Sequence, residues 1–151
     1  MRKNLLSNKV EYIPARRQIS ESIFVRVYYE DTDAGGIVYY ANYLRFAERG
    51  RTELIRSIDE LQLNTEIQDK INFVVQKCNV DYYKPARLND LIEVKTEISL
   101  VRGSVIEMFQ YIVTEEAMLV KMFVKLVCIN LVGKPVRIPK YLQKNFSKLI
   151  N

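Results

Sequence analysis

The sequence of 151 residues contains no histidine, and this absence narrows the chemistry that the protein can perform. Without an imidazole the chain has no Ser-His-Asp or Cys-His nucleophile pair, no histidine acid–base relay and no metal site that needs a histidine ligand. Any catalysis must therefore depend on carboxylate, tyrosine, cysteine or lysine side chains, or on backbone dipoles.

Cysteines and long apolar runs are also scarce. Cys78 and Cys128 are the only two cysteines, and both fall in strand-like apolar runs, where a free thiol usually packs as a small buried side chain. They indicate neither a disulfide scaffold nor, without a histidine partner, a nucleophilic thiol. No segment approaches the roughly 20 apolar residues of a membrane span, and the first residues lack the apolar run of a signal peptide. We therefore expect a cytoplasmic protein with no membrane span.

Acidic residues are almost missing from the two ends of the chain. Residues 21–116 hold 17 of the 18 acidic side chains, and residues 117–151 hold seven basic side chains and no acidic one. Solvated basic ends, or attraction of an anionic ligand such as a phosphorylated compound, would both account for this distribution. No nucleic-acid-binding motif accompanies the charges, so we expect no nucleic-acid partner.

Apolar and β-branched residues predict one long helix followed mainly by strands. Residues 22–29 (SIFVRVYY) predict a strand, and apolar residues three and four apart then predict a helix from Tyr43 to Ile58. A short helical connector is predicted over residues 61–70, and a final amphipathic helix begins at Pro139. Between them, strand-forming and alternating apolar residues predict four more strands, over residues 71–83, 91–101, 104–114 and 118–130.

This order of elements predicts an α+β fold, with one antiparallel sheet of about five strands wrapped around the long central helix. Residues 21–151 form a single domain in this interpretation, and residues 1–20 form a flexible basic extension. One helix cannot cover both faces of so large a sheet, so its outer face or an edge should be buried by another subunit. We therefore expect a homodimer or a homotetramer.

The densest polar cluster, residues 28–36 (YYEDTDAGG), lies between the first strand and the helix. A carboxylate beside a helix N-terminus could attack an electrophile or deprotonate water, and the free N–H groups of the helix could hold a developing oxyanion. Gly35 and Gly36 would let the backbone approach a substrate closely. The same residues could instead form an acidic turn that only caps the helix. The pattern alone leaves both interpretations open.

Residues 25–53 (VRVYYEDTDAGGIVYYANYLRFAERGRTE) closely resemble the signature of the 4-hydroxybenzoyl-CoA thioesterase family of hotdog-fold acyl-CoA thioesterases. The resemblance is to the YbgC, Tol–Pal-associated branch in particular. Residues 73–90 (FVVQKCNVDYYKPARLND) and 97–104 (EISLVRGS) extend it to roughly residues 22–140. It implies a hotdog fold and the hydrolysis of an acyl-CoA thioester to a carboxylic acid and free coenzyme A.

The resemblance also implies the catalytic residues. It assigns the catalytic carboxylate to Asp33, as nucleophile or as base on water, and an oxyanion-binding backbone N–H to Tyr40. Tyr40 stands where the YbgC branch usually has histidine, so that branch's acyl preference need not transfer. The Tyr40 side chain could form a wall of the pocket, which we favour, or donate a proton. Asp31 is expected to brace the loop. Glu48, three residues from both Arg45 and Arg51, is expected to form a solvated ion pair.

Four further residues are expected to bind the substrate. Basic groups at the pocket rim are expected to hold the phosphates of coenzyme A, and Arg102 matches a basic position in the resemblance, although it could also be an ordinary surface charge. Gly36, Val38 and Tyr43 are expected to line the substrate pocket, and Tyr43 could instead belong to the core. Lys134 and Arg137 are further candidates for the phosphates. We expect no metal and no separate cofactor, since coenzyme A is part of the substrate.

One alternative of a different class is a non-catalytic hotdog module that binds acyl carrier protein or an envelope-associated partner. Such a module would need the fold and the basic residues but would not need Asp33. A hotdog dehydratase normally relies on a histidine, which this chain lacks.

Overall fold

The elements follow each other in the order that the sequence predicts, with one strand, one long helix and then four strands. The computed structural model describes residues 21–58 and 70–150. The predicted extension of residues 1–20 lies outside these residues, as does the predicted connector of residues 61–70 except for its last residue. The elements are β1 (Glu21–Arg26), the 3-10 helix η1 (Tyr29–Asp31), α1 (Asn42–Ile58), β2 (Ile71–Tyr82), β3 (Leu91–Arg102), β4 (Val105–Val113), β5 (Met118–Asn130) and α3 (Lys140–Ser147).

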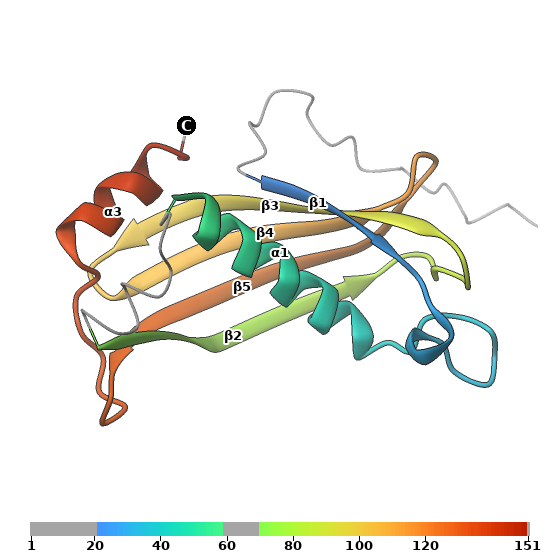
Figure 1. The fold of residues 1–151 in the computed structure, drawn as a ribbon, viewed down its shortest axis with the longest axis horizontal. Coiled ribbons are helices and arrows are strands. Elements are labelled where there is room, and N and C mark those ends of the chain that lie inside the picture. The colour runs from blue at the N-terminus through green and yellow to red at the C-terminus, as the bar shows by residue number, and fades with distance from the viewer. Residues whose placement is uncertain (1–20, 59–69, 151) are drawn as a thin grey trace, which may run out of the picture.

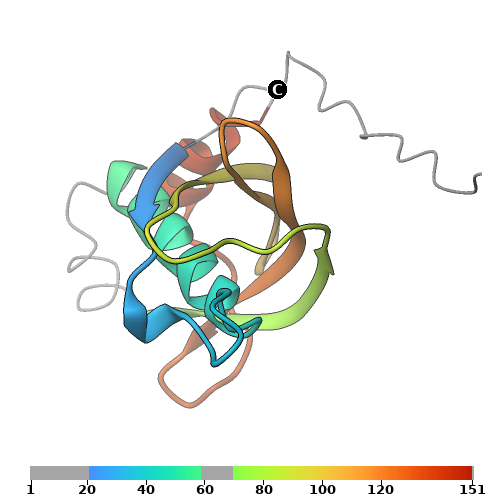
Figure 2. The same ribbon diagram turned by 90° about the vertical axis from the view of Figure 1, so that its right-hand side faces the viewer.

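The five strands form one antiparallel sheet in the order β1-β3-β4-β5-β2 (Figure 1). The sheet curls around α1, which is clearest when the molecule is seen end-on (Figure 2). The predicted hotdog fold is therefore confirmed. Consecutive strands β3, β4 and β5 are neighbours joined by short turns, whereas β1 and β2 form the two edges.

The central strands bury alternate residues, as their sequence pattern predicts, with one interruption in β3. A register shift between Ile98 and Leu100 places Ser99 as an extra residue, which is a β-bulge. The residues that follow a bulge point to the opposite faces from those that strict alternation would give them. Leu100 is therefore exposed, and Val101 turns toward the core. Strict alternation along this strand would place Leu100 on the buried face with Ile98, and the bulge prevents it.

Helix α1 packs very closely on the sheet at Gly50. A Cβ atom there would lie 2.9 Å from a methyl carbon of Val94 and 3.0 Å from the Thr96 hydroxyl oxygen. The buried Gln110 amide lies beside this contact and donates hydrogen bonds to the Ala47 carbonyl (2.8 Å) and to the Thr96 hydroxyl (2.9 Å). The absence of a side chain at Gly50 thus lets the helix rest on a polar cluster whose hydrogen bonds are all made inside the core.

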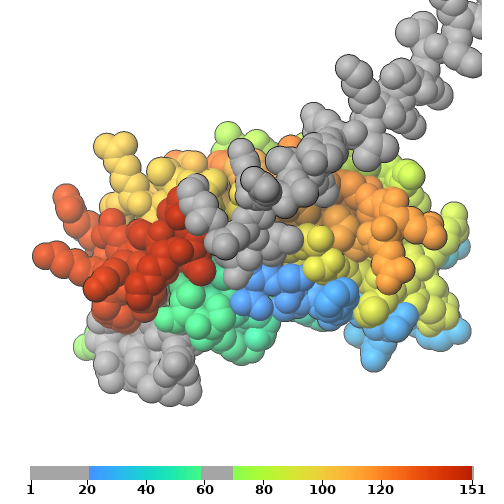
Figure 3. All heavy atoms as spheres, turned by 90° about the horizontal axis from the view of Figure 1, so that it is seen from above, coloured from blue at the N-terminus to red at the C-terminus, as the bar shows by residue number. Residues whose placement is uncertain are grey.

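The first strand and the final helix enclose the same core from two sides. β1 runs alongside α1 on one face of the molecule, and α3 lies at one end of that face (Figure 3). Leu142 and Phe146 of α3 are fully buried, and the Phe146 ring meets the Phe73 ring edge to face. Over the described ranges 21–58 and 70–150, neither helix has the length and apolarity needed to cross a membrane.

The two cysteines have different environments. Cys128 on β5 is buried, as predicted, but Cys78 on β2 is exposed. The expectation of a buried thiol fails at Cys78 because β2 is an edge strand with no neighbour on its outer side.

Candidate active site

The loop between β1 and α1 is held together by Asp31. Its carboxylate accepts a hydrogen bond from the Tyr28 N–H (2.8 Å), and its carbonyl oxygen accepts from the Tyr39 N–H and the Asn42 side-chain amide (2.9 Å each). Asp31 therefore braces the loop, as predicted. Asn42 is the first residue of α1 and ties that helix to the loop through its side chain.

Asp33 lies at the exposed tip of this loop. Its N–H donates to the Ile37 carbonyl (2.9 Å), its own carbonyl accepts from the Gly36 N–H (3.0 Å), and one carboxylate oxygen accepts from the Gly35 N–H (2.8 Å). Gly36 has φ +76°, a left-handed conformation that favours glycine. Across the described part of the chain, nothing hydrogen-bonds to the second carboxylate oxygen of Asp33, so that oxygen is available for reaction.

The start of α1 supplies backbone donors beside this loop. Tyr40 lies two residues before the helix, and its N–H has no acceptor among the described residues. The carbonyl oxygen of Tyr40 accepts a hydrogen bond from the Tyr82 hydroxyl (3.1 Å). This hydrogen bond fixes the peptide group that follows Tyr40. The first turn of α1 has no acidic residue, so no carboxylate offsets the partial positive charge there.

Val38 and Tyr43 hold the loop from inside the core. The Val38 N–H donates to the Ala86 carbonyl (2.9 Å), and the Ala86 N–H donates to the Tyr43 hydroxyl oxygen (2.8 Å). Burial raises the pKa of Tyr43, although the hydrogen bond from Ala86 partly opposes this shift. Val38 is 3% exposed and Tyr43 2% exposed, so neither side chain offers a surface to a substrate within the single chain.

Arg102 lies far from Asp33 in the same chain. The active-site loop leaves β1 at Arg26, which pairs with Leu91 at the start of β3, whereas Arg102 ends β3 eleven residues later. At about 3.3 Å per residue, the two ends of β3 are roughly 35 Å apart. The structure therefore brings Gly36, Val38 and Tyr43 to the loop of Asp33 and leaves Arg102 at the opposite end of the sheet (Figure 1).

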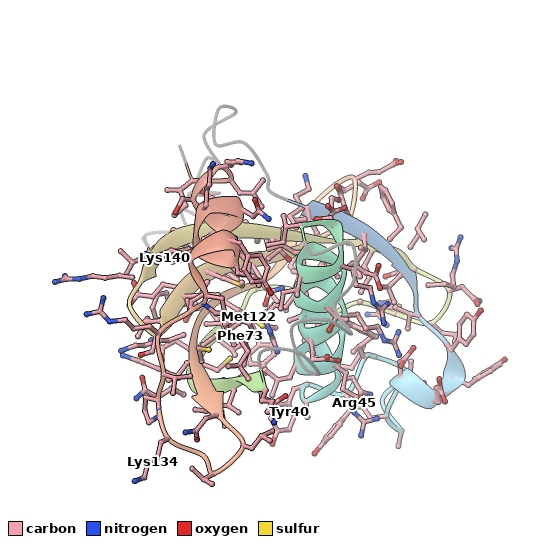
Figure 4. The ribbon with its side chains drawn as sticks, turned by 60° about the vertical axis from the view of Figure 1, so that its left-hand side comes forward. Tyr40, Arg45, Phe73, Met122, Lys134 and Lys140 are labelled. Atoms are coloured by element: carbon pink, nitrogen blue, oxygen red, sulfur yellow. The ribbon has the colours of Figure 1, made fainter. Side chains whose placement is uncertain are left out.

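A basic cluster forms at that opposite end. The Ile138 N–H donates to the Gly103 carbonyl (2.9 Å), so the segment that carries Arg137 runs beside the turn that carries Arg102. Lys134, at the tip of its loop, and Lys140, at the start of α3, point outward (Figure 4). These four exposed residues come from two distant stretches of sequence, and the fold gathers them.

Two features near the site escaped the sequence analysis. Arg51 of α1 donates to the Gln110 carboxamide oxygen (2.9 Å), a partner 59 residues away that no local pattern indicates. Glu48 accepts from the Thr52 hydroxyl (2.9 Å), and no ion pair of Glu48 with Arg45 or Arg51 is found in the described residues. The predicted ion pair is therefore wrong.

The inner face of β2 is the second feature. Directly opposite residues of an antiparallel pair share a face, so Val75, Cys78 and Tyr82 lie on the same face as three buried residues of β5. They are themselves exposed, Val75 at 50% and Tyr82 at 46%. We name these three residues the β2 strip.

Across residues 21–58 and 70–150, no cluster of three or more metal-ligating side chains is suited to hold a metal ion.

Comparisons with known proteins agree with this architecture. Residues 27–146 match the Thioesterase-like superfamily. The acyl-CoA thioesterase YbgC of Haemophilus influenzae is 44% identical over 126 residues, which cover 83% of this chain and 93% of that protein. The YbgC acyl-CoA thioesterase of Helicobacter pylori strain 26695 is 33% identical over 132 residues, which cover 83% of this chain and 96% of that protein.

Solved structures show the same fold. A probable thioesterase from Bartonella henselae is 41% identical, with a TM-score of 0.69 over 78% of this chain and 96% of that one. A 1,4-dihydroxy-2-naphthoyl-CoA thioesterase from Synechocystis has a TM-score of 0.75 over 85% of this chain and 96% of that one. At 22% identity, the similarity to the Synechocystis structure is evidence for the fold alone.

Proposed function

The chain belongs to the thioesterase-like superfamily, and we propose that it hydrolyses an acyl-CoA thioester to a carboxylic acid and free coenzyme A, with Asp33 as the reacting carboxylate. Relatives at 44% identity over most of the chain carry this activity in their names. The observation that supports a role for Asp33 is its place in the loop. One carboxylate oxygen is fixed by the Gly35 N–H, the other has no hydrogen-bond partner among the described residues, and α1 starts nine residues later, at Asn42.

The reaction would use these groups in sequence. Asp33 takes a proton from a water molecule, whose oxygen attacks the thioester carbonyl carbon. The Tyr40 N–H and the positive end of α1 hold the negative oxygen of the tetrahedral intermediate. Collapse of the intermediate breaks the carbon–sulfur bond, and the coenzyme A thiolate takes up the proton held by Asp33, which restores the carboxylate. Direct attack by Asp33, giving a mixed anhydride that water then cleaves, would use the same contacts.

A single chain leaves this site open to solvent, which supports a second subunit as part of it. Asp33, Gly36 and Tyr40 are all exposed, and water at a reacting carboxylate weakens electrostatic stabilisation. The β2 strip borders the site, because Tyr82 bonds to Tyr40. Two copies that pair their β2 strands would cover both the strip and the open side of the site.

Such a pairing gives Arg102 a role in the site of the other subunit. Antiparallel strands related by a two-fold axis bring opposite ends of the two sheets together. The basic cluster around Arg102 and Arg137 would then lie near the Asp33 loop of the neighbouring copy, where it could bind the phosphates of coenzyme A. Val38 and Tyr43, buried beneath the loop, would position it and would not touch the substrate.

The first test is hydrolysis by an Asp33→Asn variant. We expect kcat to fall by about a hundredfold or more, because the amide keeps the size of the side chain but cannot accept the proton. Free-thiol release from a panel of acyl-CoA thioesters measures the loss. Asp31→Asn is the matched control and should cost less, since Asp31 only braces the loop. Wild-type rates in folded Asp33→Asn would refute the role of Asp33.

The second test asks whether Arg102 acts across the subunit interface. Arg102→Gln should raise KM and change kcat little, and added salt should raise the wild-type KM in the same way. Mixed dimers of one Asp33→Asn subunit and one Arg102→Gln subunit should contain one fully intact site if Arg102 acts in trans, and none if it acts in cis. A mixed dimer that regains no low-KM activity would refute the trans arrangement.

A non-catalytic module that binds acyl carrier protein is the alternative that these tests would reveal. The basic cluster at the Arg102 end would suit an acidic carrier protein equally well. A chain that binds the carrier but releases no thiol from any thioester would favour that function.

A further inference from the structure

Arg51 of α1 is a partly buried cation to which no carboxylate of the described residues is hydrogen-bonded. Its guanidinium donates to the Gln110 carboxamide oxygen at 2.9 Å. In the two described stretches, none of the ion pairs involves Arg51. Burial lowers the pKa of Arg51, opposed by Glu48 and then by Cys78. Guanidinium groups withdrawn from water are normally paired with an anion, so Arg51 has unused capacity to bind one.

Arg51 is held in one orientation from below. The Gln110 side chain that accepts from Arg51 is itself fixed by hydrogen bonds to Ala47 and Thr96. Gln110 is 0% exposed, so this anchor lies inside the core. A guanidinium that is fixed in this way loses little conformational entropy when it binds a ligand, because most of that entropy is already lost.

The Gln110 side chain that accepts from Arg51 lies opposite Met122 of β5, which lies opposite Val80 of β2, so the guanidinium lies toward the inner face of β2. The Arg51 charge and the Cys78 thiol interact electrostatically, and Arg51 partly offsets the burial that raises the pKa of Cys78. Leu44 lies seven residues before Arg51, hence on the same side of α1, and is 42% exposed. On β2, Tyr82 is bonded to Tyr40, and Cys78 lies on the same face of the strand, so exposed side chains of β2 extend from the start of α1 toward Arg51.

The distance from the start of α1 to Arg51 suits an acyl chain. Arg51 lies nine residues after Asn42, the first residue of α1, which is about 14 Å along the helix axis, and Tyr40, the proposed oxyanion donor, lies two residues before Asn42. The Arg51 side chain leans back toward the N-terminus of the helix, which shortens this span. A thioester carbonyl at Tyr40 would thus place the far end of a medium-length acyl chain near the guanidinium.

We propose that Arg51 binds the far end of the acyl group and selects chains that end in a carboxylate over chains that end in a methyl group. This inference rests on the proposed thioesterase function, whose substrate class it narrows. The carboxylate would accept hydrogen bonds from the guanidinium N–H groups that Gln110 leaves free. Leu44 and the β2 strip would contact the methylene groups between the two ends.

Glu48 lies near enough to oppose this binding. It attracts Arg51 electrostatically and accepts a hydrogen bond from Thr52, and its side chain is exposed. Its negative charge would repel an incoming carboxylate, although solvent weakens that effect. Removal of this charge should therefore strengthen the preference that Arg51 creates.

The test compares octanoyl-CoA with suberyl-CoA, its counterpart with a terminal carboxylate. We expect Arg51→Gln to lower the ratio of kcat/KM for suberyl-CoA over octanoyl-CoA by about ten- to a hundredfold, as for the loss of a charge-assisted hydrogen bond. Arg51→Lys keeps the charge and should retain most of the preference, and Glu48→Gln should raise it. Arg45→Gln is the matched control, because Arg45 lies on the same helix but points away from the sheet (Figure 4).

A binding measurement keeps this test independent of turnover. Calorimetric titration of both thioesters into the Asp33→Asn protein, with and without Arg51→Gln, should show the same change in preference. Absence of hydrolysis by wild type, with that preference in binding intact, would refute the proposed function alone. A preference that Arg51→Gln changes by less than about twofold in both measurements would overturn the role of Arg51.

Discussion

The two edges of the sheet, β1 and β2, differ in how the chain covers their inner faces. β1 is only six residues long, yet Val25, at 8% exposed, is buried beside α1. β2 is twice as long, and Val75, Cys78 and Tyr82 on its inner face are exposed. Their direct neighbours on β5 are almost fully buried, namely Val120, Val124 and Leu126. On the same face of β2, Phe73 and Val80 pack against the core, and the Tyr82 ring meets the Tyr43 ring of α1. The chain thus covers the inner face of β2 only in part.

This difference links assembly to catalysis. An unpaired edge strand with exposed apolar side chains tends to pair with a strand of another chain. The same edge touches the candidate site, because the Tyr82 hydroxyl bonds to the carbonyl of Tyr40. Whatever covers β2 therefore also determines how much water reaches Asp33.

The largest effect should come from a charge placed on the open edge. Val75→Lys puts an ammonium group into the β2 strip, where burial between two subunits would be costly. We expect the dissociation constant to rise at least about tenfold. Burial of one unpaired charge costs more than the roughly 1.4 kcal/mol that corresponds to a tenfold change. Sedimentation over a range of protein concentrations, together with thiol release, would show dissociation and loss of activity in parallel.

Val74→Lys is the matched control for this change. Val74 is similarly exposed, at 40%, but faces the other side of the sheet. If both variants dissociate equally, the interface lies over the face of the sheet and the comparison of the two edges fails. Unchanged association in Val75→Lys would contradict the proposed pairing directly.

A smaller effect is expected where α1 meets the sheet at Gly50. An added methyl group would lie 2.9 Å from a carbon of Val94, and overpacking of this kind typically costs about 1–3 kcal/mol. Replacement of a helical glycine by alanine also stabilises the helix by about 1 kcal/mol, because alanine has the higher helix propensity. We therefore expect Gly50→Ala to lower the free energy of unfolding by about 1 kcal/mol, measured by urea denaturation.

A double variant identifies the cause of that loss. Val94→Ala removes the atoms that an alanine at position 50 would strike, so the two changes should be less destabilising together than the sum of each alone. Additive losses would show that the close contact at Gly50 is not what limits stability.

Local patterns predicted most of the fold. The spacing of apolar residues located α1 to within one residue, because one side of that helix is buried along its whole length. Alternation located β3, β4 and β5, since strands with one face in the core must alternate. The burial of β2 does not alternate, so its location followed from its run of strand-forming residues alone. The first strand was predicted to end three residues too late, because Tyr28 and Tyr29 are strand-forming residues that here begin the loop and η1.

Long-range geometry could not be read from the sequence. Nothing local shows that Arg102 ends its strand far from Asp33, because the distance follows from strand pairing. The burial of Val38 and Tyr43 depends on Ala86, which reaches them only in the folded chain. The exposure of Cys78 likewise follows from the position of β2 at an edge, which the apolar sequence of that strand does not reveal.

The smallest predicted effect concerns Tyr43 on the closed side of the molecule. Burial raises its pKa above the ordinary value of 10.0, so below pH 10 the residue is protonated in both folded and unfolded chains. As the pH rises further, the unfolded chain loses its proton first, and stability falls until the folded pKa is passed. Tyr43→Phe should cost roughly 1 kcal/mol at pH 8, because the Ala86 N–H loses its acceptor, and should flatten the alkaline decline in the free energy of unfolding. Tyr82→Phe is the control on the open side, where a half-exposed ring should contribute less to that decline. If the free energy of unfolding of Tyr43→Phe falls with alkaline pH as steeply as that of wild type, ionisation of the Tyr43 hydroxyl is not the cause of the alkaline loss of stability.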